Sequence, residues 1–185
     1  MCKILFINAC ARENSRTLEL SQYVLSKLQG DVEEVKLFDI NILPLDKKGL
    51  ELRENAIITK DYSSSNFALA KQFANAEIIV VGAPYWDLMF PAVLKNYLEN
   101  ITVSGLTFEY GKNGRPEEYC NGKKLIYVTT SGGPIKYNFG YEYISTLAKE
   151  FYGITDVQLV KAEGLDIYGA DISKILENAK NSFNV

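Results

Sequence analysis

The chain alternates short apolar runs with longer segments in which hydrophobic residues recur at helical spacing. The short runs are rich in β-branched residues, which is typical of buried strands. They lie at Lys3–Asn8, Val32–Phe38, Glu77–Ala83, Lys123–Thr129 and Val157–Ala162. Glu77–Ala83 is the most apolar run and is expected in the middle of a sheet, whereas the mixed polarity of Val32–Phe38 predicts an edge strand.

The longer segments predict helices between the strands. Residues 39–62 are the exception, because they are polar and irregular, with only weak helical character around Leu50–Ile57. Residues 111–122 are expected to form either a flexible lid or a surface hairpin. The predicted helices are Arg16–Leu28, a segment through Phe73 capped within Ser63–Ser65, a segment from Pro91 through Leu98, Phe139–Tyr152 and Asp171–Phe183.

Alternating strands and helices imply parallel βαβ units joined by right-handed crossovers. We therefore predict an α/β fold with a single domain over residues 1–185. The expected architecture is a doubly wound three-layer α/β/α sandwich on a five-stranded parallel sheet in the order 2-1-3-4-5. Ligands bind such sheets beyond the carboxyl ends of the strands, at the switch point between the first and third strands. The loops that leave strands one, three and four are therefore the candidate binding loops.

Composition and charge exclude several classes of function. The net charge is −3 without a basic stripe, which argues against a nucleic-acid partner. Histidine is absent, which excludes Ser-His-Asp and Cys-His hydrolases and histidine-ligated metals, so no metal site is expected. The three cysteines fit neither a disulfide framework nor a zinc site, which favours the reducing cytoplasm. No apolar stretch is long enough for a membrane span, and a first strand at Lys3 leaves no room for a signal peptide.

The first candidate loop, residues 8–17, combines hydroxyls with positive charges at the start of a helix. Ser15 and Thr17 supply the hydroxyls, and Arg12 and Arg16 supply the charges. Free backbone N–H groups and the helix dipole make such a position suitable for a phosphate. The loop lacks G-x-G-x-x-G and G-x-x-x-x-G-K-[ST], which argues against a Rossmann dinucleotide site and a P-loop. Taken alone, it leaves a second interpretation open, in which Ser15 only caps the helix.

The second and third candidate loops supply aromatic surface and glycines. Tyr85 and Trp86 follow the central strand and are flanked by prolines, an arrangement suited to a flat heteroaromatic ligand. The alternative is that they plug the end of the sheet or a dimer interface. Gly132 and Gly133 follow the fourth strand and let the backbone approach a ligand closely, such as the pyrimidine edge of a flavin. Together the three loops predict a site for a phosphate and a flat ring.

Four short motifs resemble those of one enzyme family, and the resemblance covers nearly the full length of the chain. They are Cys10-Ala11-Arg12 with Ser15-Arg16-Thr17, Pro84–Leu98 (PYWDLMFPAVLKNYL), Gly105–Tyr110 (GLTFEY) and Thr130–Gly133 (TSGG). The chain is similar in these motifs to the FMN-dependent NAD(P)H:quinone oxidoreductases and azoreductases, which include flavodoxin-like NAD(P)H dehydrogenases. The resemblance implies a flavodoxin-like fold, bound FMN, NADH or NADPH as reductant, and a homodimer.

By this resemblance, residues of the first loop hold the FMN phosphate, those of the second line the isoalloxazine, and those of the third close over its other edge. Two residues depart from the family's pattern. Cys10 replaces a usual serine, which removes a hydroxyl donor, and Asp87 replaces a usual asparagine with a carboxylate that disfavours an anionic reduced flavin. The implied cofactor-binding residues are Cys10, Ser15, Arg16, Thr17, Pro84, Tyr85, Trp86, Asp87, Leu88, Thr130, Ser131, Gly132 and Gly133.

The resemblance also implies a reaction of two steps with ping-pong kinetics. A nicotinamide delivers hydride to flavin N5, and a quinone or azo acceptor then takes the electrons. Tyr137, just beyond the glycine loop, is either a residue that contacts substrate or protonates the acceptor, or a solvent-facing tyrosine. Two other functions stay open for such a site: a flavodoxin-type electron carrier, and an FMN-binding module without catalysis.

Overall fold

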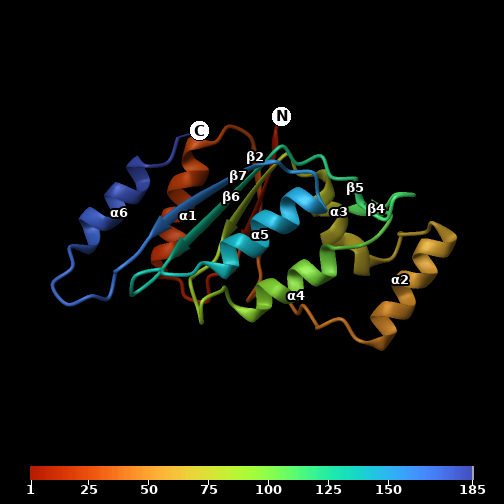
Figure 1. Cartoon of the computed structure of the whole chain (residues 1–185), viewed down its shortest axis with the longest axis horizontal. Coiled ribbons are helices and arrows are strands. Elements are labelled where there is room, and N and C mark those ends of the chain that lie inside the picture. Colours follow the sequence, from red (N-terminus) through yellow and green to blue (C-terminus); the bar gives the residue numbers. More distant parts are fainter. Residues whose placement is uncertain (185) are drawn as a thin grey trace.

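The computed structural model describes residues 1–184, which form a parallel sheet between two layers of helices (Figure 1). The five strands run in the order β2-β1-β3-β6-β7, and each neighbouring pair is parallel. This confirms the predicted fold class and strand order. The strands of the sheet are β1 (Lys3–Asn8), β2 (Asp31–Lys36), β3 (Ile78–Gly82), β6 (Lys124–Thr130) and β7 (Asp156–Ala162).

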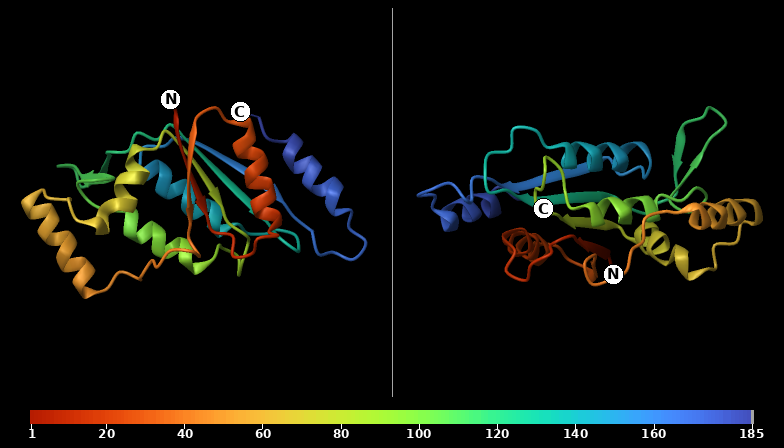
Figure 2. Two further views of the ribbon diagram at one scale, coloured as in Figure 1. Left: turned by 180° about the vertical axis from the view of Figure 1, so that it is seen from behind. Right: turned by 90° about the horizontal axis from the view of Figure 1, so that it is seen from below.

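Helices cover both faces of the sheet (Figure 2). Leu20 and Val24 of α1 and Leu176 of α6 share one hydrophobic cluster, and side chains of α3, α4 and α5 belong to a second, larger cluster on the other face. Within residues 1–184, none of the helices is long and apolar enough to cross a membrane. The helices that cover the sheet are α1 (Arg16–Lys27), α3 (Ala68–Asn75), α4 (Ala92–Ile101), α5 (Phe139–Glu150) and α6 (Ile172–Asn181).

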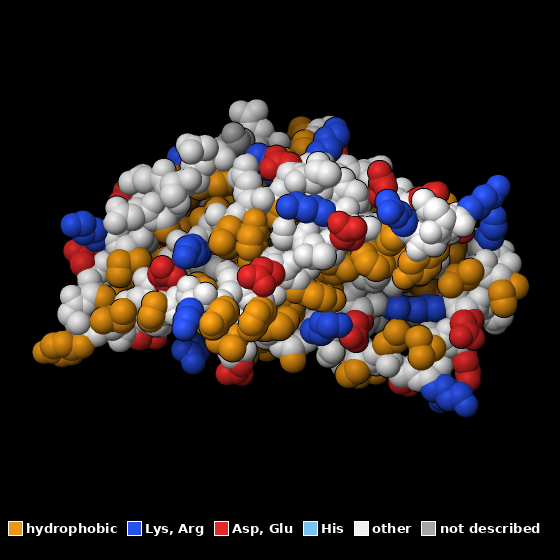
Figure 3. Space-filling view, viewed as in Figure 1, with side chains coloured by type: hydrophobic (Ala, Val, Ile, Leu, Met, Phe, Trp, Pro, Cys, Tyr) orange, Lys and Arg blue, Asp and Glu red, His pale blue; other side chains and the backbone are white. Residues whose placement is uncertain are grey.

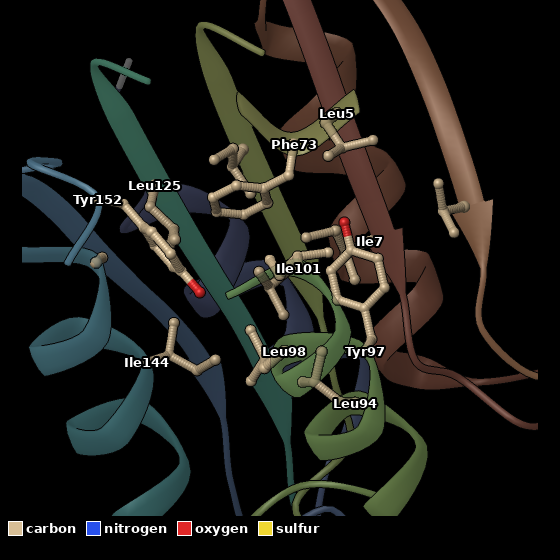
Figure 4. Packing of buried hydrophobic residues seen from close by; sticks show 14 of the residues in the cluster. Leu5, Ile7, Phe73, Leu94, Tyr97, Leu98, Ile101, Leu125, Ile144 and Tyr152 are labelled. Carbon is tan, nitrogen blue, oxygen red and sulfur yellow. The ribbon is translucent and has the colours of Figure 1, made fainter. Parts of the chain in front are cut away.

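The larger cluster fixes α4 against the sheet (Figure 4). Tyr97 of α4 is fully buried, and its hydroxyl has no hydrogen-bond partner among the described residues. Burial raises the pKa of this phenol far above its usual range. The rings of Phe73 and Tyr152 pack edge-on, with centroids 4.7 Å apart. Because α4 follows the aromatic candidate loop directly, this packing fixes one end of that loop.

The segment 39–62 is more regular than expected, because the weak helical character around Leu50–Ile57 lies within a complete helix, α2 (Lys47–Thr59). Asp46 caps this helix by accepting a hydrogen bond of 2.8 Å from the backbone N–H of Gly49. Only Ala56 of α2 is buried, so the helix has no apolar stripe that a hydrophobic pattern could reveal. Figure 1 shows α2 at the periphery, away from the sheet.

Residues 111–122 lie in and after a short antiparallel hairpin, formed by β4 (Phe108–Tyr110) and β5 (Pro116–Glu118). The hairpin lies near the start of β6, opposite the carboxyl ends of the strands (Figure 1). Its residues do not line the cavity that the described chain forms at those ends. Within one chain the segment is therefore a surface hairpin rather than a lid.

Candidate functional site

A cavity of about 430 Å³ opens at the carboxyl ends of the central strands. The three loops predicted from the sequence all contribute to its wall, and the loop after β7 adds a fourth part. The volume lies within the range of about 300–1,000 Å³ that is usual for small-molecule sites. The lining residues are Ala11, Arg12, Asn14, Ser15, Arg16, Thr17, Pro84, Tyr85, Trp86, Thr130, Ser131, Gly132, Leu165 and Asp166.

The first wall is the N-terminus of α1. The Ser15 hydroxyl accepts a hydrogen bond of 3.3 Å from the backbone N–H of Leu18, so Ser15 does cap the helix. This does not exclude a ligand, because the hydroxyl keeps its own hydrogen to donate. Thr17 is buried and its hydroxyl lies 2.6 Å from that of Thr130. The first and third predicted loops are thus joined directly at the floor of the cavity.

The second wall is the aromatic loop. The Tyr85 hydroxyl donates a hydrogen bond of 2.7 Å to the carbonyl of Tyr137. Trp86 is 43% exposed, and its ring centroid lies 6.5 Å from that of Phe38. The two aromatic side chains are therefore available at the cavity rather than packed as a plug within this chain.

Behind Trp86 the chain makes a two-residue turn at Asp87 and Leu88. The N–H of Met89 donates to the carbonyl of Trp86 at 2.8 Å, and the reverse bond measures 3.1 Å. Asp87 has a φ of 49° and Leu88 a φ of 69°, so both adopt the left-handed conformation of a type I′ turn. Neither residue lines the cavity in the described structure.

Cys10, Gly133 and Tyr137 also lie beside the cavity rather than in its lining. The Cys10 sulfur points to the carbonyl of Gly82 at 3.7 Å, and burial raises the pKa of the thiol to about 11. The thiol is therefore protonated at neutral pH. The ring of Tyr137 stacks on that of Phe139 at a centroid distance of 5.8 Å, with half of Tyr137 exposed.

The sequence reasoning missed Asn14, Leu165 and Asp166. Asp166 pairs with Arg16, its Oδ1 accepting a hydrogen bond of 2.7 Å from Arg16 Nη1. The predicted topology could have indicated this loop. The loop leaves the fifth strand at the same edge of the sheet as the three candidate loops. No residue type in the loop after β7 marks it as part of a phosphate or ring site.

A model of the family with the flavodoxin-like fold matches residues 2–184. The chain belongs to this family. The family resemblance that the four motifs predicted is therefore confirmed.

Relatives of this flavodoxin-like chain align over almost its whole length. The FMN-dependent NADH:quinone oxidoreductase of Coprothermobacter proteolyticus is 33% identical over 195 residues, which cover 97% of this chain and 94% of that protein. The FMN-dependent NADH:quinone oxidoreductase 2 of Clostridium acetobutylicum is 34% identical over 193 residues, which cover 96% of this chain and 94% of that protein.

Solved structures of the same flavodoxin-like fold superimpose closely. An azoreductase from Bacillus anthracis gives a TM-score of 0.85 at 23% identity, covering 98% of this chain and 96% of that one. An FMN-dependent NADH-azoreductase from the same species, in complex with FMN, gives a TM-score of 0.79 at 23% identity. The match covers 98% of this chain and 95% of that one. At this level of identity the likeness shows the shared fold.

Proposed function

We propose that the protein is an FMN-dependent oxidoreductase that takes electrons from NADH or NADPH and passes them to quinone or azo acceptors. The observation that carries the proposal is one cavity in which a helix N-terminus with hydroxyls and cations meets an aromatic pair and a glycine loop. The names of relatives at 33% and 34% identity support the activity.

The first turn of α1 holds the FMN phosphate. The backbone N–H groups of Arg16 and Thr17 begin that turn, and neither has an intrahelical acceptor. Arg12 and Arg16 add positive charge to the same wall. The Ser15 hydroxyl donates its free hydrogen to a phosphate oxygen.

The aromatic loop and the glycine loop hold the ring. Tyr85 and Trp86 would hold the isoalloxazine from one wall, and Ser131 and Gly132 would hold it from the other. Bound FMN would supply the two-electron chemistry that links a nicotinamide to the acceptor. Tyr137, half exposed beside Tyr85, faces the acceptor. Reductant and acceptor use the same open side in turn, which gives ping-pong kinetics.

The protein acts as a homodimer. Figure 3 shows apolar side chains gathered over α4 and α5, where Val93, Tyr143 and Leu147 are only partly buried. Sedimentation equilibrium is expected to give twice the chain mass, and a monomer at micromolar concentration would contradict the dimer.

The three cysteines are unpaired, which fits the cytoplasm as the protein's location.

Two measurements on the purified protein test the function. Denaturation is expected to release FMN from the yellow protein, and NADH consumption is expected when benzoquinone or an azo dye is added. Bound FMN without nicotinamide oxidation would favour an electron carrier, and no FMN affinity would overturn the proposal.

Tyr85→Ala is expected to lower FMN affinity about tenfold, whereas Tyr110→Ala, on the exposed hairpin, leaves it unchanged.

A further inference from the structure

The loop after β7 is fixed to the glycine loop by backbone hydrogen bonds. Gly164–Asp166 donates three such bonds, of 2.9 to 3.2 Å, to the carbonyls of Ser131–Gly133. The Asp166 side chain lies against Gly132, where an added Cβ would be 2.3 Å from Asp166 Oδ2. The backbone hydrogen bonds therefore place Asp166 on the cavity wall.

From this position Asp166 reaches across to α1. Arg16 Nη1 donates a hydrogen bond of 2.7 Å to Asp166 Oδ1 and one of 3.2 Å to the carbonyl of Leu165. The side chains of Arg16 and Asp166 are 37% and 71% exposed, so the pair lies at the rim of the cavity rather than on its floor. It joins two walls that are separated by 150 positions in the sequence.

Arg16 and Asp166 both line the cavity, and their partial exposure places the pair at its open rim. FMN ends in one phosphate, whereas FAD continues through a second phosphate to an adenosine. A phosphate on the first turn of α1 would lie beside Arg16, and a ligand that continued past it toward the rim would meet the Arg16–Asp166 bridge. The carboxylate opposes a second phosphate by charge as well as by volume.

We propose that Asp166 is a specificity-determining residue that makes the site selective for the mononucleotide over the dinucleotide form of a flavin. Arg16 remains able to bind the single phosphate, because the contacts to Asp166 and Leu165 use only one of its terminal nitrogens and the guanidinium carries five N–H donors. The inference rests on the proposed flavin function of the same cavity.

Equilibrium ultrafiltration with FMN and with FAD, read by absorbance of the free flavin, tests the inference. The wild-type protein is expected to bind FMN at least about 100-fold more tightly than FAD. Asp166→Ala is expected to reduce that ratio to below about tenfold, and Asp166→Asn, which keeps the volume but removes the charge, to give an intermediate ratio. Asp156→Ala removes another carboxylate, paired with Lys124 at 3.4 Å and outside the cavity, and is expected to leave the ratio unchanged.

The ratio separates selectivity from a purely structural role. If Asp166 only held Arg16 in place, both affinities would fall together in the variants and the ratio would stay constant, which would overturn the inference. Equal binding of FMN and FAD by the wild-type protein would overturn it while leaving the proposed function intact. Failure to bind either flavin would overturn both. If Asp166→Ala does not fold, the wild-type and Asp166→Asn ratios still decide the question.

Discussion

Leu88 has a backbone conformation that suits a glycine better than a leucine. Its φ of 69° lies in the left-handed region, which costs a residue with a Cβ about 1–2 kcal/mol. Asp87, the other central residue of the turn, tolerates this region better because aspartate is enriched there. Strain of this kind collects at functional loops, where surrounding structure maintains it. Here the turn holds Trp86 at the cavity.

We therefore expect Leu88→Gly to raise the free energy of unfolding by about 0.5–1 kcal/mol, after the larger backbone entropy of glycine in the unfolded chain is subtracted. Little burial is lost, because Leu88 is 47% exposed. Urea unfolding of the flavin-free protein measures the change. Leu43→Gly is the matched control, since Leu43 is 67% exposed and its φ is not positive, and its stability is expected to fall. A similar fall for Leu88→Gly would contradict the strain.

Residue type alone predicted part of the site and missed another part. Ser15, Tyr85 and Gly132 stand out because a hydroxyl at a helix start, an aromatic after a strand and a glycine in a turn each carry a local signal. Asp166 carries none, because an acidic residue does not suggest a phosphate site. Its place depends on Arg16, which only the folded chain brings beside it.

The helix α2 shows why an element with few buried residues leaves only a weak pattern in the sequence. A helix that packs by an apolar stripe reveals itself through periodicity, but α2 buries only Ala56. Its main attachment is Arg53. The Nη2 of Arg53 donates a hydrogen bond of 2.6 Å to the carbonyl of Glu99, and its Nη1 donates one of 3.4 Å to the carbonyl of Thr102. These carbonyls belong to the end of α4, where the helix leaves them without intrahelical partners.

Arg53→Ala is therefore expected to lower the free energy of unfolding by about 1–2 kcal/mol, because hydrogen bonds to a charged donor are lost from partly buried carbonyls. Urea unfolding of the variant measures the loss, and Arg53→Lys is expected to lose less. Lys48→Ala, an exposed position on the same helix, serves as the control and should change stability little. If both alanine variants behaved alike, Arg53 would not anchor α2.

The order of the sheet could be predicted because polarity differs between its strands. The apolar run around Val80 lies at the centre and the polar run around Glu33 at the edge, as observed. Strand order then located the cavity, since the switch point follows from it. The depth of the cavity and its closure by the loop after β7 could not be predicted, because they depend on side chains from loops far apart in the chain.

Buried thiols and phenols give the molecule a common response to alkaline pH. Burial raises the pKa of Cys10 to about 11 and that of Cys120 to about 12, from the ordinary 9.0. Both thiols are protonated in the folded and unfolded chain below pH 9, so neither changes stability there. Above it only the unfolded chain releases these protons readily, so stability must fall. Burial raises the pKa of three phenols in the same way, those of Tyr97, Tyr127 and Tyr152.

We expect the free energy of unfolding to fall between pH 9 and 11, by up to about 1.4 kcal/mol per pH unit for each thiol. Urea unfolding in reducing buffer at several pH values measures the slope. The double variant Cys10→Ser with Cys120→Ala is expected to show a shallower slope between pH 9 and 10, before the phenols contribute. An unchanged slope would mean that the thiols ionise as easily in the folded chain as in the unfolded one.

The cavity wall is assembled from residues that range from Ala11 to Asp166, and this has a kinetic consequence. No single hairpin or βαβ unit contains the wall, so it cannot exist before β7 has paired with β6 and Asp166 has reached Arg16, 150 positions away in the sequence. A ligand of the cavity can therefore recognise only chains that have finished folding. A higher ligand concentration would therefore lower the rate of unfolding without raising the rate of the early steps of collapse. The amount of ligand bound would measure the number of fully folded molecules.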